Sequence, residues 1–232
     1  KYFDKLNIPY SCCGSNVSAM TFNKSACNEE LSKLGFNCPK SISYKINEDY
    51  NVKDIIKTIG LPCFIKPNES GSSFGISKAK TEREISEGIS KSLSFDDSVI
   101  IEEFINGTEV SCSVFSKNDQ INTLPITEII SHNEFFDYDA KYNGLSEEIT
   151  PARIDSKVNE TIQEISQNIY KKMNLKGVCR IDFIIMNSLI YVIEINTIPG
   201  LSSESIVPKQ VRAANISLSD FFNNWIESTL NK

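Results

Sequence analysis

The sequence predicts an α+β protein, in which helices and strands alternate along a chain of 232 residues. Three observations support this fold class. The spacing of apolar residues changes repeatedly between a helical period and a strand period. The composition, 40% hydrophobic and 23% charged, is typical of a globular protein. Two apolar runs, residues 177–185 and 189–196, have the pattern of a β-hairpin near the carboxyl end. The length allows one large domain or two small ones.

Three helices are expected in the first half of the chain, with strands between them. Apolar residues recur at helical spacing over 23–36 and 51–59, and a glycine lies at the end of each segment. A third helix is expected over 81–95, because Thr81 and Glu84 have the spacing of a capping box. The apolar runs between these helices predict two strands, residues 41–46 and 61–67.

The second half is expected to begin with two strands, residues 98–105 and 108–115. The dipeptide Asn106-Gly107 between them is a strong signal for a tight hairpin turn. A helix is predicted over roughly 156–174, before the hairpin at 177–196. The tail, residues 217–230, has an apolar stripe of Phe221, Phe222 and Trp225, which predicts an amphipathic helix packed on the core.

Charge and composition exclude several classes of protein. The net charge of −6 and an isoelectric point near 5.0 argue against binding to nucleic acid as the main function. No apolar run approaches the roughly 18 to 20 residues that span a bilayer, and the first residues lack the apolar region of a signal peptide. We therefore expect a cytoplasmic protein without membrane contact. The seven cysteines show no paired CxxC spacing, which favours buried reduced thiols over disulfides or a zinc site.

The segment "IKPNESGSSFG", residues 65–75, combines a lysine at a strand end with a loop of small polar residues. Backbone N–H groups of such a loop can turn towards a polyphosphate, and the hydroxyls of Ser72 and Ser73 add donors. The GxxxxGK order of a Walker loop is absent. The alternative interpretation is a solvated loop with Lys66 at its edge.

The segment "VIIEEFINGTE", residues 99–109, is an apolar strand with two acids at its end. Because side chains alternate between the faces of a strand, Glu102 or Glu103 must face the more covered side and needs a hydrogen-bond donor there. An adenine amino group or a ribose hydroxyl would serve as that donor. Alternatively, this is an edge strand with both acids in water.

The register of the hairpin at 177–196 decides which polar side chains meet. A three-residue turn at 187–189 would pair Ile190 with Met186 and place Asp182 opposite Glu194. A two-residue turn would offset these positions by one residue. We therefore treat the three-residue turn as a prediction.

In that register, two carboxylates face each other about 5 Å apart at Cβ, and Arg180 lies opposite Asn196. Oxygen ligands from Asp182, Glu194 and Asn196 suit Mg²⁺, and Arg180 could hold a phosphoryl group being transferred. The alternative is a solvent-side salt-bridge cluster of Arg180 with the acids, which leaves Asn196 unexplained.

The motifs together resemble one family. In chain order, "NK" at residues 23–24, "FIKPNESGSSFG", "IIEEFINGTE", "FFDYDAKY", "RIDF", "EINTIPG" and "SSESIVP" are similar to motifs of the ATP-grasp D-alanine–D-alanine ligases. This resemblance covers nearly the whole chain. It implies the ATP-grasp fold, with two α+β subdomains and ATP between two antiparallel sheets.

The resemblance also implies a domain division. Residues 1–22 would be a remnant of an N-terminal domain with its linker, 23–105 the central subdomain and 106–232 the C-terminal subdomain. The missing N-terminal domain would supply part of the first D-alanine site. We therefore expect this chain alone to be an incomplete enzyme.

The resemblance implies roles for the matched residues. The nucleotide ligands would be the side chains of Lys24, Lys66 and Lys141 for the phosphates, Glu102 with the backbone of Glu103 and Ile105 for adenine, and Glu109 for ribose. Two Mg²⁺ or Mn²⁺ ions would be bound by Asp182, Glu194 and Asn196 and would bridge the phosphates.

The family's reaction has two steps. The carboxylate of one D-alanine attacks the γ-phosphate of ATP, and the amine of a second D-alanine then displaces phosphate from the acyl phosphate. The resemblance implies that Arg180 and the backbone at Gly200 stabilise the oxyanion. It implies that Ser205 and Ile206 lie beside the second substrate. The product would serve peptidoglycan precursor synthesis, and a homodimer would be typical of the family.

Specificity for the acceptor is tied to Tyr142. The resemblance implies that this tyrosine bonds Ser72, whereas relatives that form an ester with D-lactate have phenylalanine in this loop. The sequence thus favours an amine acceptor. Three alternatives stay open: a D-alanine–D-lactate ligase, another ATP-grasp carboxylate–amine ligase, and a nucleotide-binding module without turnover.

Overall fold

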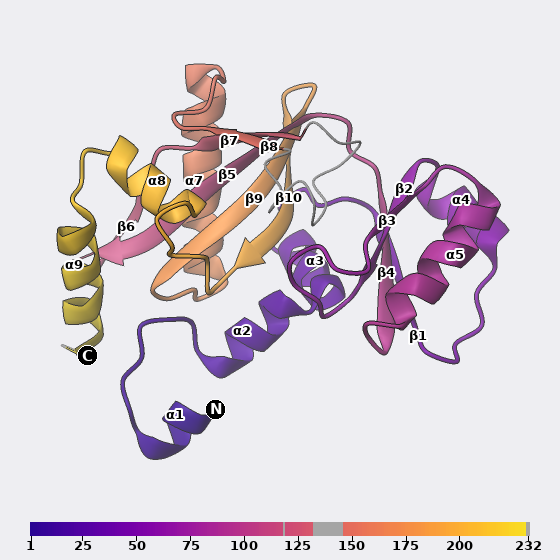
Figure 1. The fold of residues 1–232 in the computed structure, drawn as a ribbon, viewed down its shortest axis with the longest axis horizontal. Helices are drawn as coiled ribbons and strands as arrows, with labels where there is room; N and C mark the ends of the chain where they lie inside the picture. Colours follow the sequence, from indigo (N-terminus) through magenta and orange to yellow (C-terminus); the bar gives the residue numbers. More distant parts are fainter. Residues whose placement is uncertain (118, 132–145, 231–232) are drawn as a thin grey trace. The chain divides into compact units, whose positions relative to one another are not determined.

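The computed structural model describes residues 1–117, 119–131 and 146–230 (Figure 1). The chain forms two compact units, each built around its own sheet. The four-stranded unit consists of Phe22–Gly107 and Ile130–Glu147. The six-stranded unit consists of Lys1–Thr21, Thr108–Ile129 and Glu148–Lys232. The α+β class predicted from the sequence is thus confirmed.

The sheet of the four-stranded unit is antiparallel and has the order β1-β4-β2-β3. Its strands are β1 (Ser41–Lys45), β2 (Cys63–Pro67), β3 (Ser77–Ala79) and β4 (Ser98–Glu103). Its helices are α3 (Lys24–Lys33), α4 (Val52–Ile59) and α5 (Glu82–Leu93). Figure 1 shows α4 and α5 beside this sheet, and their buried isoleucines pack with those of β2 and β4. The expected capping box is present, since the hydroxyl of Thr81 accepts from the Glu84 backbone N–H and the Glu84 carboxylate from that of Thr81.

The predicted hairpin turn at Asn106-Gly107 is wrong. β4 pairs on one side with β1 and on the other with β2, so no edge remains for the next strand. That strand, β5 (Thr108–Lys117), belongs to the other sheet. The Asn-Gly segment therefore lies at one of the points where the chain passes from one unit to the other, and local turn chemistry was overridden by the pairing of distant strands.

The sheet of the six-stranded unit has the order β10-β9-β5-β7-β8, with β6 also paired to β5. Its remaining strands are β6 (Gln120–Thr123), β7 (Thr127–Ser131), β8 (Ser146–Ile149), β9 (Val178–Met186) and β10 (Leu189–Asn196). The pairings of β5 with β6, β7 and β9, and of β9 with β10, are antiparallel. The other helices are α1 (Tyr2–Leu6), α2 (Ser15–Phe22), α7 (Ser156–Lys172), α8 (Ile206–Ala213) and α9 (Leu218–Leu230).

Helices cover both faces of the long strand β5. α7 lies along the face that carries Cys112, whose thiol meets Ser166 of that helix (Figure 1). On the other face, the buried Val207 and Val211 of α8 share a core with Phe221 of α9. The predicted apolar stripe of α9 is thus confirmed, with Phe222 and Trp225 packed against this core.

The burial of the cysteines agrees with the expectation of buried thiols. Five of the seven cysteines are buried, as predicted. Among the described residues, no helix has the length and apolarity needed to cross a membrane.

Candidate active site

The hairpin of β9 and β10 has the predicted strand register at the site, although its turn is shorter than predicted. Its turn contains two residues, Asn187 and Ser188, with φ of 49° and 66°, so Met186 faces Leu189 and the predicted three-residue turn is wrong. A bulge between Val192 and Glu194 then inserts one residue into β10. An inserted residue shifts the following pairs by one position.

Beyond the bulge, Asp182 pairs with Glu194 and Arg180 with Asn196, as the sequence predicted. The register shift caused by the shorter turn and the opposite shift caused by the bulge cancel each other. The bulge also moves the polar side chains of β10 onto the face they share with Asp182, since Val192 before it and Ile195 after it are the buried residues.

A row of polar side chains crosses four strands at this level. Thr127 of β7 pairs with Ser111 of β5, Ser111 pairs with Asp182 of β9, and Asp182 pairs with Glu194 of β10. Residues in register on adjacent antiparallel strands point to the same face. The sequence therefore concentrates its hydroxyl and carboxylate groups on one face of a sheet whose other face packs on α7.

Asp182 is the centre of a hydrogen-bond network, and only 7% of the residue is exposed. Arg180 donates to both of its carboxylate oxygens, from Nε at 2.9 Å and from Nη2 at 2.8 Å. The amide of Asn196 donates to Oδ2 at 3.0 Å, and the hydroxyl of Ser111 donates to Oδ1. Such a bidentate ion pair fixes both partners in orientation as well as position.

The charge of Arg180 is secured by its neighbours. Burial of the guanidinium acts to lower its pKa, but the charges of Asp182, Glu194 and Glu148 outweigh that effect, and the pKa of Arg180 lies above its ordinary value. The salt bridge of the alternative interpretation does exist. It is mostly buried, however, and does not face solvent as that interpretation assumed.

Glu194 differs from Asp182 in its partners. Within the described part of the chain, no hydrogen bond or ion pair to the Glu194 carboxylate is found, although Asp182 faces it across the hairpin. Two carboxylates against one guanidinium leave a net negative charge on this face. Together with the amide oxygen of Asn196, they form an oxygen donor set that fits Mg²⁺ or Mn²⁺. No group of three or more His, Cys, Asp or Glu side chains that could bind a metal occurs among the described residues, and this set has only two.

The segment after β10 brings Gly200 against Ser205. A Cβ atom added at Gly200 would lie 2.7 Å from the Ser205 Oγ, closer than such contacts allow. Ser205 is the N-cap residue of α8, and Ile206, the first residue of that helix, is buried. The structure thus places Gly200, Ser205 and Ile206, three of the four residues predicted for the acyl centre and the second substrate, side by side.

In the four-stranded unit, Glu102 is buried with 3% exposure and Glu103 is half buried, which decides between the two acids that the sequence left open. Lys66 of β2 pairs with its Oε2, and the amide of Asn28 on α3 donates to Oε1 at 2.8 Å. The alternative of an edge strand with both acids in water is wrong, because β4 lies inside the sheet. Each oxygen of Glu102 keeps a second lone pair for a ligand.

The other predicted nucleotide residues lie in both units. Lys24, at the start of α3, donates to the Ser70 carbonyl at 2.7 Å, and the Glu103 backbone N–H donates to Lys40. Ile105 is buried. Ser72 lies in a tight turn of the glycine-rich loop with φ of 53°. Glu109 lies on β5 of the six-stranded unit, opposite Ile184. Lys141 and Tyr142 lie outside the described residues.

Sequence reasoning missed several residues of these networks. They are Asn28 beside Glu102, Ser111 beside Asp182, and Glu148, Lys209 and Gln210 around α8. Ser111 was open to prediction, since it alternates with apolar residues and shares a strand face with Glu109. Asn28 and Glu148 carry no local signal, because their partners are more than 60 residues away in the chain.

Comparison with known proteins gave consistent matches. A family model described as the D-ala D-ala ligase C-terminus matches residues 30–227. A D-alanine–D-alanine ligase from Flavobacterium johnsoniae is 46% identical over 231 residues, which are 99% of this chain and 71% of the relative. One from Bacteroides fragilis is 42% identical over 228 residues, 98% of this chain and 70% of the relative.

Solved structures agree with these relatives. The D-alanine–D-alanine ligase from Bacillus anthracis superimposes with a TM-score of 0.85 at 29% identity, over 99% of this chain and 74% of the other. A structure of that ligase complexed with ATP also gives a TM-score of 0.85, at 27% identity, over 99% of this chain and 73% of the other. The VanG D-Ala:D-Ser ligase from Enterococcus faecalis gives a TM-score of 0.86 at 34% identity, over 97% of this chain and 66% of the other.

Proposed function

The chain belongs to the D-alanine–D-alanine ligase family, and we propose that it takes part in the ATP-dependent joining of two D-alanines through a D-alanyl phosphate. The observation that carries the proposal is the Arg180–Asp182 pair beside Glu194 and Asn196, in a chain so similar to ligases of that name. The product would enter peptidoglycan precursor synthesis. We place this reaction in the cytoplasm, where ATP is supplied.

For nucleotide binding, we assign the phosphates to Lys24, Lys66 and Lys141, because cations offset the phosphate charge. Glu102 would accept a hydrogen bond from adenine through its remaining lone pairs, with the backbone at Glu103 and Ile105 beside it. Glu109 would bond the ribose. The contact of Lys66 with Glu102 supports this assignment, since it holds the lysine in one orientation before ATP arrives.

For the metal ions, the oxygen donor set is of the right chemical type, and a metal at Asp182 would replace one of the two hydrogen bonds that each of its oxygens accepts. Asp182, Glu194 and Asn196 would hold two Mg²⁺ or Mn²⁺ ions. Bound there, the metals would neutralise charge on the phosphates as the phosphoryl group is transferred. Asp182 has the further task of orienting Arg180, because its two oxygens already receive the guanidinium.

At the acyl centre, we propose that Arg180 and the Gly200 backbone stabilise the oxyanion that forms when the second amine attacks. A preorganised donor of this kind contributes about 3 to 4 kcal/mol to transition-state stabilisation. The close approach of Gly200 and Ser205 supports a shared pocket for the acyl group and the acceptor. Ser205 would bond the acceptor carboxylate beside Ile206, and Tyr142 with Ser72 would favour an amine acceptor over D-lactate.

The test is an assay of the whole protein as its gene encodes it. D-alanine should cause release of phosphate from ATP in the presence of Mg²⁺, with D-alanyl-D-alanine as the product identified by mass spectrometry. Phosphate release with another amino or hydroxy acid, and none with D-alanine, would refute the assignment. Binding of ATP without any turnover would favour a nucleotide-binding module instead.

The acceptor separates the alternatives within the family. Competition among D-alanine, D-serine and D-lactate at neutral pH should yield mainly the D-alanine product, whereas a depsipeptide product would identify a D-alanine–D-lactate ligase. We also propose a homodimer, as in the family, which sedimentation of the whole protein would test.

A further inference from the structure

The hydroxyl of Ser205 is oriented by a short turn and not by its own helix. As N-cap of α8 it makes no capping hydrogen bond from its side chain. Its hydroxyl instead shares a hydrogen bond of 2.8 Å with that of Ser202, and its backbone N–H donates to the Ser202 carbonyl at 2.9 Å. The direction of the Ser205 hydroxyl therefore depends on how the turn 202–205 and the start of α8 are held.

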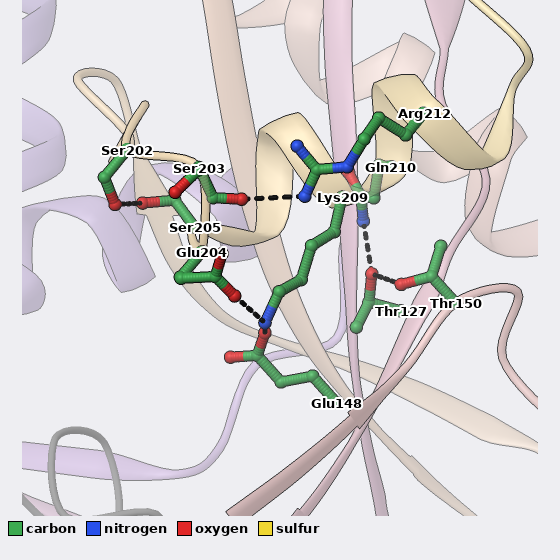
Figure 2. A network of polar contacts seen from close by, with 10 residues as sticks. All are labelled: Thr127, Glu148, Thr150, Ser202, Ser203, Glu204, Ser205, Lys209, Gln210 and Arg212. Atoms are coloured by element: carbon green, nitrogen blue, oxygen red, sulfur yellow. Dashed lines mark hydrogen bonds and ion pairs between the residues drawn. The ribbon is translucent and has the colours of Figure 1, made fainter.

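One anchor of α8 is buried and uncharged. The side chain of Gln210 is fully buried, and its amide donates to the Ser111 carbonyl at 2.9 Å. The same amide donates to the Thr127 hydroxyl at 3.1 Å (Figure 2). Thr127 in turn shares a hydrogen bond of 2.6 Å with Thr150. This anchor fixes the middle of α8 to β5 and β7.

A second anchor is charged and lies nearer to Ser205. Figure 2 shows the Lys209 side chain directed at two carboxylates: its Nζ lies 3.1 Å from Glu148 Oε2 on β8 and 3.9 Å from Glu204 Oε2. The Lys209 and Glu148 side chains are 31% and 19% exposed, whereas Glu204 is 83% exposed. The contact with Glu148 is therefore the stronger one, because it is shorter and less screened by water.

The position of this lysine needs a partner. It is the fourth residue of α8, where a cation is disfavoured by the helix dipole. Glu148 compensates for that cost, and its charge also acts on Arg180. A third contact, from Arg212 to the Ser203 carbonyl at 2.7 Å, ties the turn 202–205 back onto the same helix.

We propose that the Lys209–Glu148 ion pair is a positioning device for the acceptor site, which ties the first turn of α8 to β8 and so holds Ser205 ready for the acceptor carboxylate. This inference rests on the proposed function. Lys209 is a positioning residue, since it acts through the turn and α8. Its loss should weaken binding of the second amino acid and leave the phosphoryl-transfer step nearly unchanged.

The kinetic test compares three variants in the whole protein. Lys209→Met should raise the KM of the acceptor site about fivefold, from the D-alanine dependence fitted to a two-site rate law, with kcat changed by less than about twofold. Lys209→Arg keeps the charge and should restore the KM. Lys171→Met, which removes an exposed lysine of α7, is the control and should match the unmodified protein. An unchanged acceptor KM in Lys209→Met, or equal changes in both KM values and kcat, overturns the proposal.

The partner provides a second test if Lys209→Met does not fold. Glu148→Gln should raise the same KM, and the exchanged pair, Lys209→Glu with Glu148→Lys, should recover most of the lost affinity. A double variant no better than the worse single variant would show that the two side chains do not act as a pair, and the proposal would fail.

A third measurement does not depend on activity. Amide hydrogen exchange over 201–206 in the ligand-free protein should be faster in Lys209→Met than in the unmodified chain, with β9 unchanged. Inactivity of the unmodified protein towards D-alanine would refute the proposed function. The hydrogen-exchange rates would even then show whether the Lys209–Glu148 pair holds the turn. Equal exchange rates in both proteins would refute the positioning role of the Lys209–Glu148 pair and leave the proposed function untouched.

Discussion

Each sheet has a buried acid beside a cation among the predicted site residues, but only one of these two clusters has equal numbers of positive and negative charges. In the four-stranded unit, Glu102 meets Lys66 and the amide of Asn28, so one negative charge faces one positive charge. In the six-stranded unit, Asp182 meets Arg180, and a second carboxylate, Glu194, faces the pair. The first cluster is complete as a structural element, whereas the second still lacks positive charge. A buried acid next to a cation is thus not by itself evidence of a metal site. The additional acid, Glu194, is what distinguishes the Asp182 cluster from the Glu102 cluster.

The surplus acid gives the largest expected effect. Glu194→Gln keeps the shape of the side chain and removes its charge, so turnover should fall by on the order of 10²- to 10³-fold or more. Stability should stay the same or rise slightly, because Asp182 loses a repelling neighbour. Phosphate release and thermal unfolding measure the two effects, and Glu160→Gln on the exposed side of α7 is the control. Unchanged turnover would remove Glu194 from the proposed metal site.

The balanced cluster should respond in the opposite way. Glu102→Gln removes the counter-charge of a Lys66 side chain that is 14% exposed. The free energy of unfolding should fall by about 2 to 3 kcal/mol, measured by urea denaturation. Glu103→Gln is the matched control: that neighbouring carboxylate is only half buried and accepts from the Lys40 backbone N–H, so its loss should cost less than about 1 kcal/mol. Equal losses in both variants would show that the Lys66 pair has no special weight.

The two regions also differ in how far they were predictable. Alternation along one strand predicted that Glu102 or Glu103 would face the covered side, without deciding between them. The structure buries Glu102. The pairing of Asp182 with Glu194 was predicted correctly, but from a turn length that is wrong. The bulge after Val192 that corrects the register leaves no mark in a run of apolar residues, since its position is set by packing on both faces of the sheet.

The remaining failures have one physical cause. Asn106-Gly107 has the composition of a hairpin turn, yet β1 and β2 occupy both edges of β4. α8 was not predicted as a helix, because it has only eight residues with a proline among them and depends on anchors from β5, β7 and β8. The local sequence limits the conformations that a segment can adopt, and contacts between residues distant in sequence decide which of these conformations forms.

The close contact of Gly200 with Ser205, which involves no charged side chain, provides a third prediction for the six-stranded unit. Gly200→Ala would place a methyl group 2.7 Å from the unmodified position of Ser205 Oγ, so the serine must move. We expect an acceptor KM about tenfold higher and a small change in stability, because both residues lie near the surface. Steady-state kinetics on D-alanine measure the first effect and thermal unfolding the second. An unchanged KM would contradict the proposal that Ser205 binds the acceptor.

The smallest effect is expected from an ion pair on the other face of the same sheet. Glu128 pairs with Val110 and not with the row of Ser111, and Arg153 donates to both of its carboxylate oxygens at 2.9 Å. These hydrogen bonds hold the pKa of Glu128 below its ordinary value of 4.5, so the folded protein binds fewer protons there than the unfolded chain. The stabilisation is therefore present above pH 4.5 and disappears as the pH falls through the lowered pKa.

Arg153→Met should lower the free energy of unfolding by no more than about 1 kcal/mol at pH 7, because the arginine is largely exposed. Urea denaturation between pH 7 and pH 3 should show this difference shrinking towards zero in acid, while turnover at pH 7 stays unchanged. A difference that persists in acid would mean that Arg153 stabilises by packing and not by charge. A loss of turnover would contradict the separation of a catalytic and a structural face, since this pair and the Asp182 cluster share a sheet but point away from each other.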